Sequence, residues 1–124
     1  MKRCLVADQS EIIRKVARHY LEQLSYDVLE ADNASEALEL CQSNSIDALI
    51  LDWRLPDKTA VEFLTALRFS SEGTRRPLVI YSTSENDAAD ISRAFSAGAD
   101  TYLIKPFDKH AFMETLANAG MTAA

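Results

Sequence analysis

Short apolar segments alternate with longer amphipathic ones along the chain. The apolar segments lie near residues 3–7, 27–31, 47–51, 78–82 and 101–104. Each has the length of a single β-strand. Because their residues are apolar almost throughout, rather than alternately apolar and polar, these segments predict strands that are covered on both faces.

Each predicted strand is followed by a segment with helical periodicity. These segments lie near residues 10–24, 33–44, 59–70, 86–97 and 108–119. In the first one we expect a single apolar helix face made of Ile12, Ile13, Val16, Ala17, Tyr20, Leu21 and Leu24. Asn33, with Glu36 three residues later, predicts the N-cap of the second helix, and Gly98 predicts the end of the fourth. This alternation predicts an α/β fold built on a parallel sheet with helices on both faces.

Polar residues stand where four of the predicted strands end. They are Asp8, Asp52, Ser82 and Lys105. Ligands bind outside the carboxyl ends of parallel strands, so we expect these side chains to meet at one edge of the sheet. Each has an ordinary explanation when taken alone, such as a helix N-cap for Asp8 or a solvated loop residue for Lys105. Their joint occurrence favours a site.

These four side chains suggest a specific chemistry. Two carboxylates attract a divalent cation, and oxygen ligands select a hard ion such as Mg²⁺. The carboxylate of Asp52 is then a candidate nucleophile toward a phosphoryl group. The Lys105 ammonium can hold a phosphoryl oxygen, and the Ser82 hydroxyl can donate a hydrogen bond to another.

Composition narrows the class of protein. The chain has 124 residues, 48% hydrophobic and 26% charged, which predicts one globular domain over residues 1–124. A formal net charge of −6 argues against strong binding to nucleic acid or to anionic membranes. Cys4 and Cys41 are expected to be reduced core residues, and no targeting segment precedes Asp8, so we expect a cytoplasmic protein.

The chain resembles the receiver domains of bacterial two-component response regulators, of the chemotaxis type that consists of a receiver alone. The resemblance rests on the segments Leu5 to Ser10, Leu51 to Pro56, Ile80 to Thr83, Ala97 to Asp100 and Tyr102 to Phe107. It implies a flavodoxin-like (βα)5 fold with a doubly wound parallel sheet in the strand order 2-1-3-4-5. Because the chain ends soon after the fifth predicted helix, we expect no output domain.

The resemblance also implies roles for the residues at the strand ends. Asp52 would accept a phosphoryl group from a sensor histidine kinase or a histidine phosphotransferase. Mg²⁺ would be held by Asp8, Asp52 and the backbone carbonyl of Arg54. Ser82 and Lys105 would contact the phosphoryl group, and the peptide bond after Lys105 would be cis.

A switch between two states follows from the same resemblance. The Ser82 hydroxyl would move toward the phosphoryl group and Tyr102 would turn inward. The surface formed by the fourth helix, fifth strand and fifth helix would then change its affinity for an unidentified target protein. An alternative for Tyr102 is a half-buried aromatic residue with its hydroxyl in water. We expect a monomer.

One departure from the family pattern concerns the metal site. Receivers usually carry two consecutive acids at the end of the first strand, and here the first of them is replaced by Ala7. We expect weaker Mg²⁺ binding with phosphorylation retained. The alternative is a pseudo-receiver, an interaction domain that acts without phosphorylation because its metal site lacks one acid.

Two further departures lie near the expected site. The side chains of Arg54 and Ser84 should face each other at its mouth, where residues of the family tune how fast water removes the phosphoryl group. The Arg54 guanidinium could pair there with Asp8 or with the phosphoryl group, and the alternative is an exposed loop arginine without a role in the site. Ala60 replaces the glycine that usually precedes the third helix, and a positive φ there would strain it, so a locally different turn is expected.

Two other protein classes fit the sequence less well. A haloacid dehalogenase needs a second Asp two residues after the nucleophile, where this chain has Arg54. A flavin- or dinucleotide-binding domain needs a glycine- or hydroxyl-rich phosphate loop after the first strand, whereas residues 8–11 contain two acids and no glycine. We therefore expect no enzyme activity beyond the self-phosphorylation and self-dephosphorylation of Asp52.

Overall fold

The computed structural model describes residues 2–70, 76–84 and 87–121. Within these ranges the strands are β1 Arg3–Ala7, β2 Asp27–Ala31, β3 Ala48–Asp52, β4 Leu78–Thr83 and β5 Thr101–Ile104. The helices are α1 Glu11–Gln23, α2 Ala34–Ser43, α3 Ala60–Ser70, α4 Ala88–Ala97 and α5 Lys109–Asn118. The strands pair in parallel in the order β2-β1-β3-β4-β5, which confirms the predicted fold and strand order.

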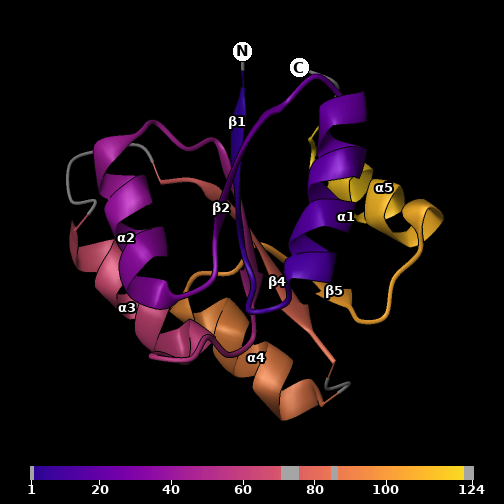
Figure 1. Ribbon diagram of the computed structural model, residues 1–124. Helices are drawn as coiled ribbons and strands as arrows, with labels where there is room; N and C mark the ends of the chain where they lie inside the picture. Colours follow the sequence, from indigo (N-terminus) through magenta and orange to yellow (C-terminus); the bar gives the residue numbers. More distant parts are fainter. Residues whose placement is uncertain (1, 71–75, 85–86, 122–124) are drawn as a thin grey trace.

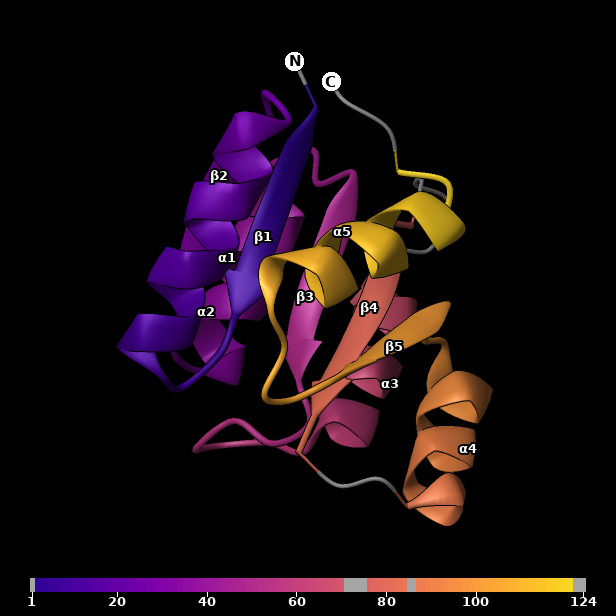
Figure 2. The ribbon, with the colours of Figure 1, turned by 90° about the vertical axis from the view of Figure 1, so that its right-hand side faces the viewer.

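The sheet is covered by helices on both faces (Figure 1). Helices α2, α3 and α4 bury apolar side chains against one face, and α1 and α5 bury theirs against the other. Figure 2 shows α5 lying across the strands on the second face. Successive residues of β3 enter the two cores in turn, Leu49 and Leu51 on one face and Ala48 and Ile50 on the other. This alternation explains why the strands are apolar throughout.

Side-chain caps define where the helices begin. The Asn33 side chain accepts a hydrogen bond from the backbone N–H of Glu36 at 2.8 Å, as the sequence predicts for an N-cap. Ser10, rather than Asp8, caps α1, because its side chain accepts from the N–H of Ile13. Gly98 ends α4 with a φ of 126°, a conformation that favours glycine.

The predicted apolar face of α1 is wrong at Ile12, whose exposed fraction is 76%. The buried centre of the helix lies at Ala17 and Leu21. Leu21 is about two and a half turns from Ile12, so the two side chains point in opposite directions. Helical periodicity located the apolar stripe but overestimated its width.

The turn before α3 does not place Ala60 at a positive φ. Ala60 is the first residue of α3, and Ser25 is the only non-glycine residue with a positive φ in the described ranges. An isolated antiparallel bridge between Arg54 and Thr59 closes the preceding loop. Ala60 is therefore accommodated without backbone strain.

None of the helices in the described ranges has the length and apolar character needed to cross a membrane.

Candidate acid and lysine site

The carboxyl ends of β1, β3, β4 and β5 bring the four predicted site residues together. Asp52 is the last residue of β3 and lies in register with Ser82 of β4. Asp8 follows β1, and Lys105 follows β5, where its N–H donates to the Thr83 carbonyl at 2.8 Å. The side chains of Asp8, Asp52 and Ser82 are buried. The parallel sheet therefore places two carboxylates, one hydroxyl and one ammonium at one edge.

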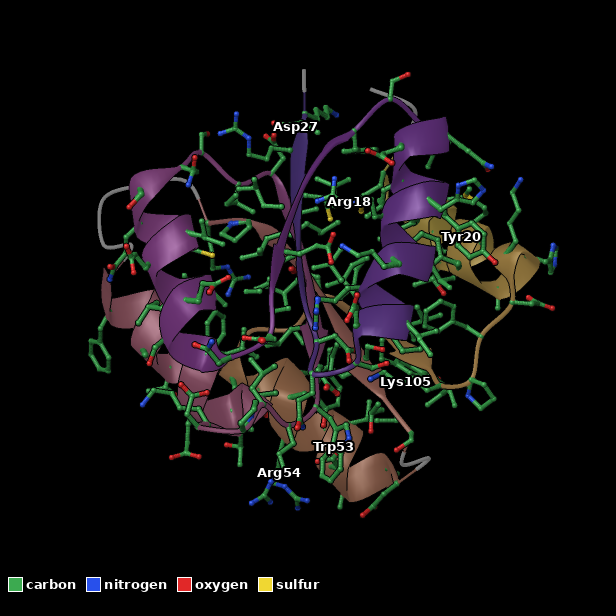
Figure 3. The ribbon with its side chains drawn as sticks, in the orientation of Figure 1. Arg18, Tyr20, Asp27, Trp53, Arg54 and Lys105 are labelled. Atoms are coloured by element: carbon green, nitrogen blue, oxygen red, sulfur yellow. The ribbon has the colours of Figure 1, made fainter. Side chains whose placement is uncertain are left out.

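Lys105 binds both carboxylates directly. Its Nζ lies 2.7 Å from Asp8 Oδ2 and 3.0 Å from Asp52 Oδ1, and the lysine side chain is 16% exposed. Two buried carboxylates close together repel each other, and a bridging ammonium offsets part of that repulsion. Figure 3 shows Lys105 at the same end of the sheet as Trp53, the residue that follows Asp52.

The environment of Asp52 disfavours its ionised form. Burial raises the pKa of Asp52, and the charge of Asp8 raises this pKa further. The charge and hydrogen bond of Lys105 lower it only in part, so the pKa stays above its ordinary value. A carboxylate in this position is stabilised by any additional positive charge that enters the pocket.

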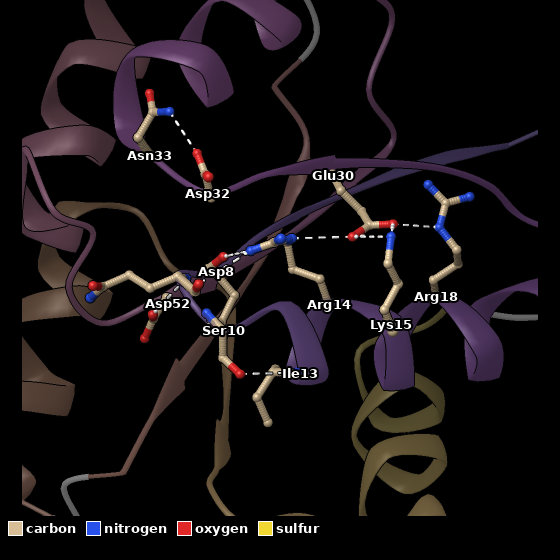
Figure 4. A network of polar contacts seen from close by, with 11 residues as sticks. Asp8, Ser10, Ile13, Arg14, Lys15, Arg18, Glu30, Asp32, Asn33 and Asp52 are labelled. Carbon is tan, nitrogen blue, oxygen red and sulfur yellow. Dashed lines mark hydrogen bonds and ion pairs between the residues drawn. The ribbon is translucent and has the colours of Figure 1, made fainter.

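The loop after β1 is fixed by a polar network (Figure 4). Asp8 Oδ1 accepts from the N–H of Ser10 at 2.8 Å, and the Asp8 carbonyl accepts from Arg14 Nη1 at 2.8 Å. Arg14 Nε in turn donates to Glu30, which also receives hydrogen bonds from Lys15 and Arg18. These bonds orient the Asp8 carboxylate toward the strand ends and restrict its movement.

Ser82 is a buried polar residue whose hydroxyl lacks a hydrogen-bond partner among the described residues. It is 1% exposed, and its Oγ has no hydrogen-bond partner within the described residues. A buried hydroxyl without a partner costs free energy, and buried polar atoms of native proteins rarely remain so. Because Ser82 lies in register with Asp52, a group attached to that carboxylate would lie near the hydroxyl.

Arg54, which was expected at the mouth of the site, does not pair with Asp8. Its side chain is exposed and extends away from the sheet (Figure 3). Within the described ranges its guanidinium makes no hydrogen bond or ion pair, and Asp8 pairs with Lys105 instead. Ser84 is exposed just beyond β4.

The donor set suits a hard divalent cation. The expected set comprises the carboxylates of Asp8 and Asp52 and the backbone carbonyl of Arg54, all of them oxygen ligands. Among the described residues no group of three or more His, Cys, Asp or Glu side chains gathers at one point. Ala7 is fully buried in the apolar core that faces α2, α3 and α4. The site therefore has two acids where the family usually has three.

Two features of the site were not predicted from the sequence. The Gln9 side chain reaches the Arg54 carbonyl, with a distance of 2.6 Å between Nε2 and the oxygen. Tyr81 is buried in the core, as we expected. Its hydroxyl donates a hydrogen bond to Asp90 Oδ2 of α4 at 2.6 Å. The position of Gln9 directly after Asp8 was the only available signal, and it says nothing of where the side chain points.

Tyr102 lies on the surface next to α4. It is 43% exposed, and its ring packs edge-on against Phe95 with a centroid distance of 6.2 Å. Together with Ile91 of α4, these rings line a shallow hollow. The outward position leaves the side chain room to move.

The peptide bond between Lys105 and Pro106 is cis, as the resemblance implies.

Comparison with known proteins places the chain in a family. A sequence model of the response regulator receiver domain matches residues 4–117. The transcriptional regulatory protein SrrA of Staphylococcus aureus is 33% identical over 103 residues, which cover 83% of this chain and 41% of that protein. The chain thus spans less than half the length of this curated relative.

Solved structures agree with this assignment. The chemotaxis response regulator CheY4 of Vibrio cholerae has a TM-score of 0.86 at 29% identity, covering 96% of this chain and 98% of that one. A response regulator of Burkholderia pseudomallei, solved with a phosphorylated aspartic acid, a calcium ion and citrate, has a TM-score of 0.80 at 26% identity, covering 97% and 69%. On the family match, the fold and the geometry of the strand ends, the chain belongs to the response regulator receiver domains of two-component signalling.

Proposed function

We propose that this protein is a phosphorylation-operated switch in which Asp52 accepts the phosphoryl group. The observation that carries the proposal is the buried, unpartnered hydroxyl of Ser82, in register with Asp52 among the described residues. Lys105 supplies a partly buried positive charge on the same carboxylate. A nucleophilic oxygen, an ammonium and a free hydroxyl donor together suit a phosphoryl group, whose oxygens need charged and hydrogen-bonding partners.

The proposed transfer forms an acyl phosphate. An oxygen of the Asp52 carboxylate attacks phosphorus of a phosphohistidine, the P–N bond breaks, and the imidazole nitrogen leaves with the bonding electron pair. Lys105 exchanges one of its carboxylate contacts for a phosphoryl oxygen, and Ser82 donates to another. Asp8, Asp52 and the Arg54 carbonyl would hold Mg²⁺, which offsets the negative charge brought in by the phosphoryl group.

The proposed partners follow from the family. The donor is a sensor histidine kinase or a histidine phosphotransferase, and the output is a change in affinity for a target protein at the α4, β5 and α5 surface. Movement of Ser82 toward the phosphoryl group would shift β4, and Tyr102 on β5 would leave its exposed position. The phosphorylated aspartic acid recorded in the Burkholderia pseudomallei relative supports this chemistry.

The second candidate function is a pseudo-receiver that signals without phosphorylation. It is favoured by one observation, the buried methyl group of Ala7 at the position of the usual third acid. Such a protein would keep the fold and the interaction surface but would not form an acyl phosphate.

Incubation with acetyl phosphate and Mg²⁺, followed by intact mass spectrometry, separates the two functions. We expect the wild-type protein to gain one phosphoryl group and Asp52→Asn to gain none, because the amide is not a nucleophile. Asp32→Asn, which changes an exposed aspartate, should be modified like the wild type. A wild-type protein that gains no phosphoryl group would support the pseudo-receiver.

The exposed guanidinium of Arg54 is proposed to prolong the life of the phosphoryl group. At the mouth of the site it can pair with a phosphoryl oxygen and hinder the approach of water. We expect Arg54→Ala to shorten the half-life of the phosphorylated protein about two- to fivefold, the effect of one exposed charge pair. Decay is followed by mass spectrometry after removal of acetyl phosphate. Lys109→Ala, which removes an exposed charge from α5, should leave the half-life unchanged, and an unchanged half-life in Arg54→Ala would reject this role.

A further inference from the structure

Gln9 contacts two of the residues that would hold the metal ion, Asp52 and Arg54. Its side-chain Nε2 donates to the Arg54 carbonyl at 2.6 Å, and its backbone N–H donates to Asp52 Oδ2 at 3.4 Å. Its own carbonyl accepts from Arg14 Nη1 at 3.3 Å, the same guanidinium that holds the Asp8 carbonyl. Two backbone contacts fix the main chain of Gln9, and one hydrogen bond fixes its side chain, although the residue is exposed.

These contacts fall on the oxygens that a divalent cation would use. Lys105 donates to Asp8 and to Asp52, and Gln9 donates to Asp52 and to the Arg54 carbonyl. Each of the three oxygen ligands of the proposed metal site thus already accepts a hydrogen bond from the chain itself. The Gln9 amide is the only side chain, among the described residues, that donates to the carbonyl ligand.

We infer that Gln9 is a positioning residue that competes with the metal ion for the Arg54 carbonyl and so weakens Mg²⁺ binding. This inference rests on the proposed function, because it assigns the carbonyl of Arg54 to the metal. The hydrogens of an amide carry positive partial charge, and the Gln9 nitrogen that bears them lies 2.6 Å from the oxygen that the cation would use. Mg²⁺ binds its oxygens at about 2.0–2.1 Å, so the amide and the cation repel each other across one acceptor.

The competition is partial, because a carbonyl oxygen has two lone pairs and the amide occupies one of them. A cation that uses the occupied lone pair displaces the Gln9 side chain, which exchanges this bond for one with water, whereas a cation at the other lone pair shares the oxygen with the amide. A site with only two acids has little charge with which to offset that exchange. The occupied carbonyl adds to the effect of Ala7, and both lower the affinity for Mg²⁺.

The test is the affinity for Mg²⁺ in Gln9→Ala, without any phosphoryl donor. Trp53 is the only tryptophan of the chain and directly follows Asp52, so its fluorescence reports on the pocket. We expect Gln9→Ala to bind Mg²⁺ about three- to tenfold more tightly than the wild type, the fold-change expected from one net hydrogen bond. Gln42→Ala, which removes an exposed glutamine from α2, should bind like the wild type.

Gln9→Glu provides a second variant, because a carboxylate cannot donate to the carbonyl and adds negative charge near the metal. It should bind Mg²⁺ more tightly than Gln9→Ala. Thermal unfolding without metal shows whether the variants are folded, and a merely structural role of Gln9 would lower the melting temperature without raising the affinity. The inference would be overturned if Gln9→Ala bound Mg²⁺ as tightly as the wild type or more weakly. It would also be overturned if neither protein bound Mg²⁺ saturably. Phosphorylation of the wild type by acetyl phosphate is measured separately, so failure of the proposed function is distinguished from failure of this role.

Discussion

Replacing Lys105 with methionine is expected to slow the phosphorylation of Asp52 about 100-fold while Mg²⁺ binds more tightly. The lysine Nζ lies 2.7 Å and 3.0 Å from the two carboxylates. Its positive charge is partly buried and preorganised by two contacts, so its removal should cost about as much as the loss of an oxyanion-hole donor. Mg²⁺ competes with the same ammonium for Asp8 and Asp52, and we expect its affinity to rise at least about tenfold in the variant.

The two effects are measured independently. The rate of phosphorylation by acetyl phosphate is followed by mass spectrometry at saturating Mg²⁺, and the affinity by Trp53 fluorescence. Without metal the variant leaves two buried carboxylates without the ammonium that bridges them, so its melting temperature should fall and added Mg²⁺ should restore more stability than in the wild type. Lys109→Met, with an exposed lysine on α5, serves as control. A variant with unchanged phosphorylation rate and unchanged Mg²⁺ affinity would contradict the role of Lys105.

Replacing Phe112 with alanine is expected to lower the free energy of unfolding by about 3–5 kcal/mol. The Phe112 side chain is fully buried, and its ring centroid lies 5.3 Å from that of Tyr20 on α1 and 5.5 Å from that of Phe107. The substitution would leave a cavity where α5, α1 and the segment after Lys105 meet. Because this packing holds α5 against the sheet, its loss should be felt by the whole domain.

Urea unfolding monitored by Trp53 fluorescence measures this loss. The matched control is Phe69→Ala, since Phe69 is 76% exposed on α3 and its removal should cost about 0.5 kcal/mol or less. Similar losses in both variants would show that Phe112 does not carry the packing of α5.

Most of the fold could be predicted because its physical signal is local. A strand buried on both faces is apolar at nearly every position, and a helix end is marked by a cap such as Asn33 or by Gly98. The strand order 2-1-3-4-5 came from the resemblance. Ile12 was misplaced because periodicity gives the direction of an apolar stripe more reliably than its width.

The sequence predicted which residues meet at the candidate site, but not which hydrogen bonds and ion pairs they form. Parallel strands place Asp8, Asp52, Ser82 and Lys105 at one edge, whatever the side-chain rotamers are. The pairing of Lys105 with Asp8, rather than of Arg54 with Asp8, depends on rotamers and burial that residue order does not encode. The hydrogen bond of Gln9 to Arg54 has the same origin, since it joins residues on two loops. The roles of these residues in phosphorylation stay predictions.

The most direct test of the account is the position of the acyl phosphate. The protein is phosphorylated with acetyl phosphate and Mg²⁺ and then treated with sodium borohydride. One hydride displaces phosphate from the aspartyl phosphate to give an aldehyde, and a second hydride with a proton gives homoserine. Peptide mapping by mass spectrometry then locates the homoserine. We predict that it replaces Asp52 alone. Homoserine at another aspartate such as Asp8, or none in a protein incubated with fresh donor, would contradict the assignment of Asp52 as the phosphoryl acceptor.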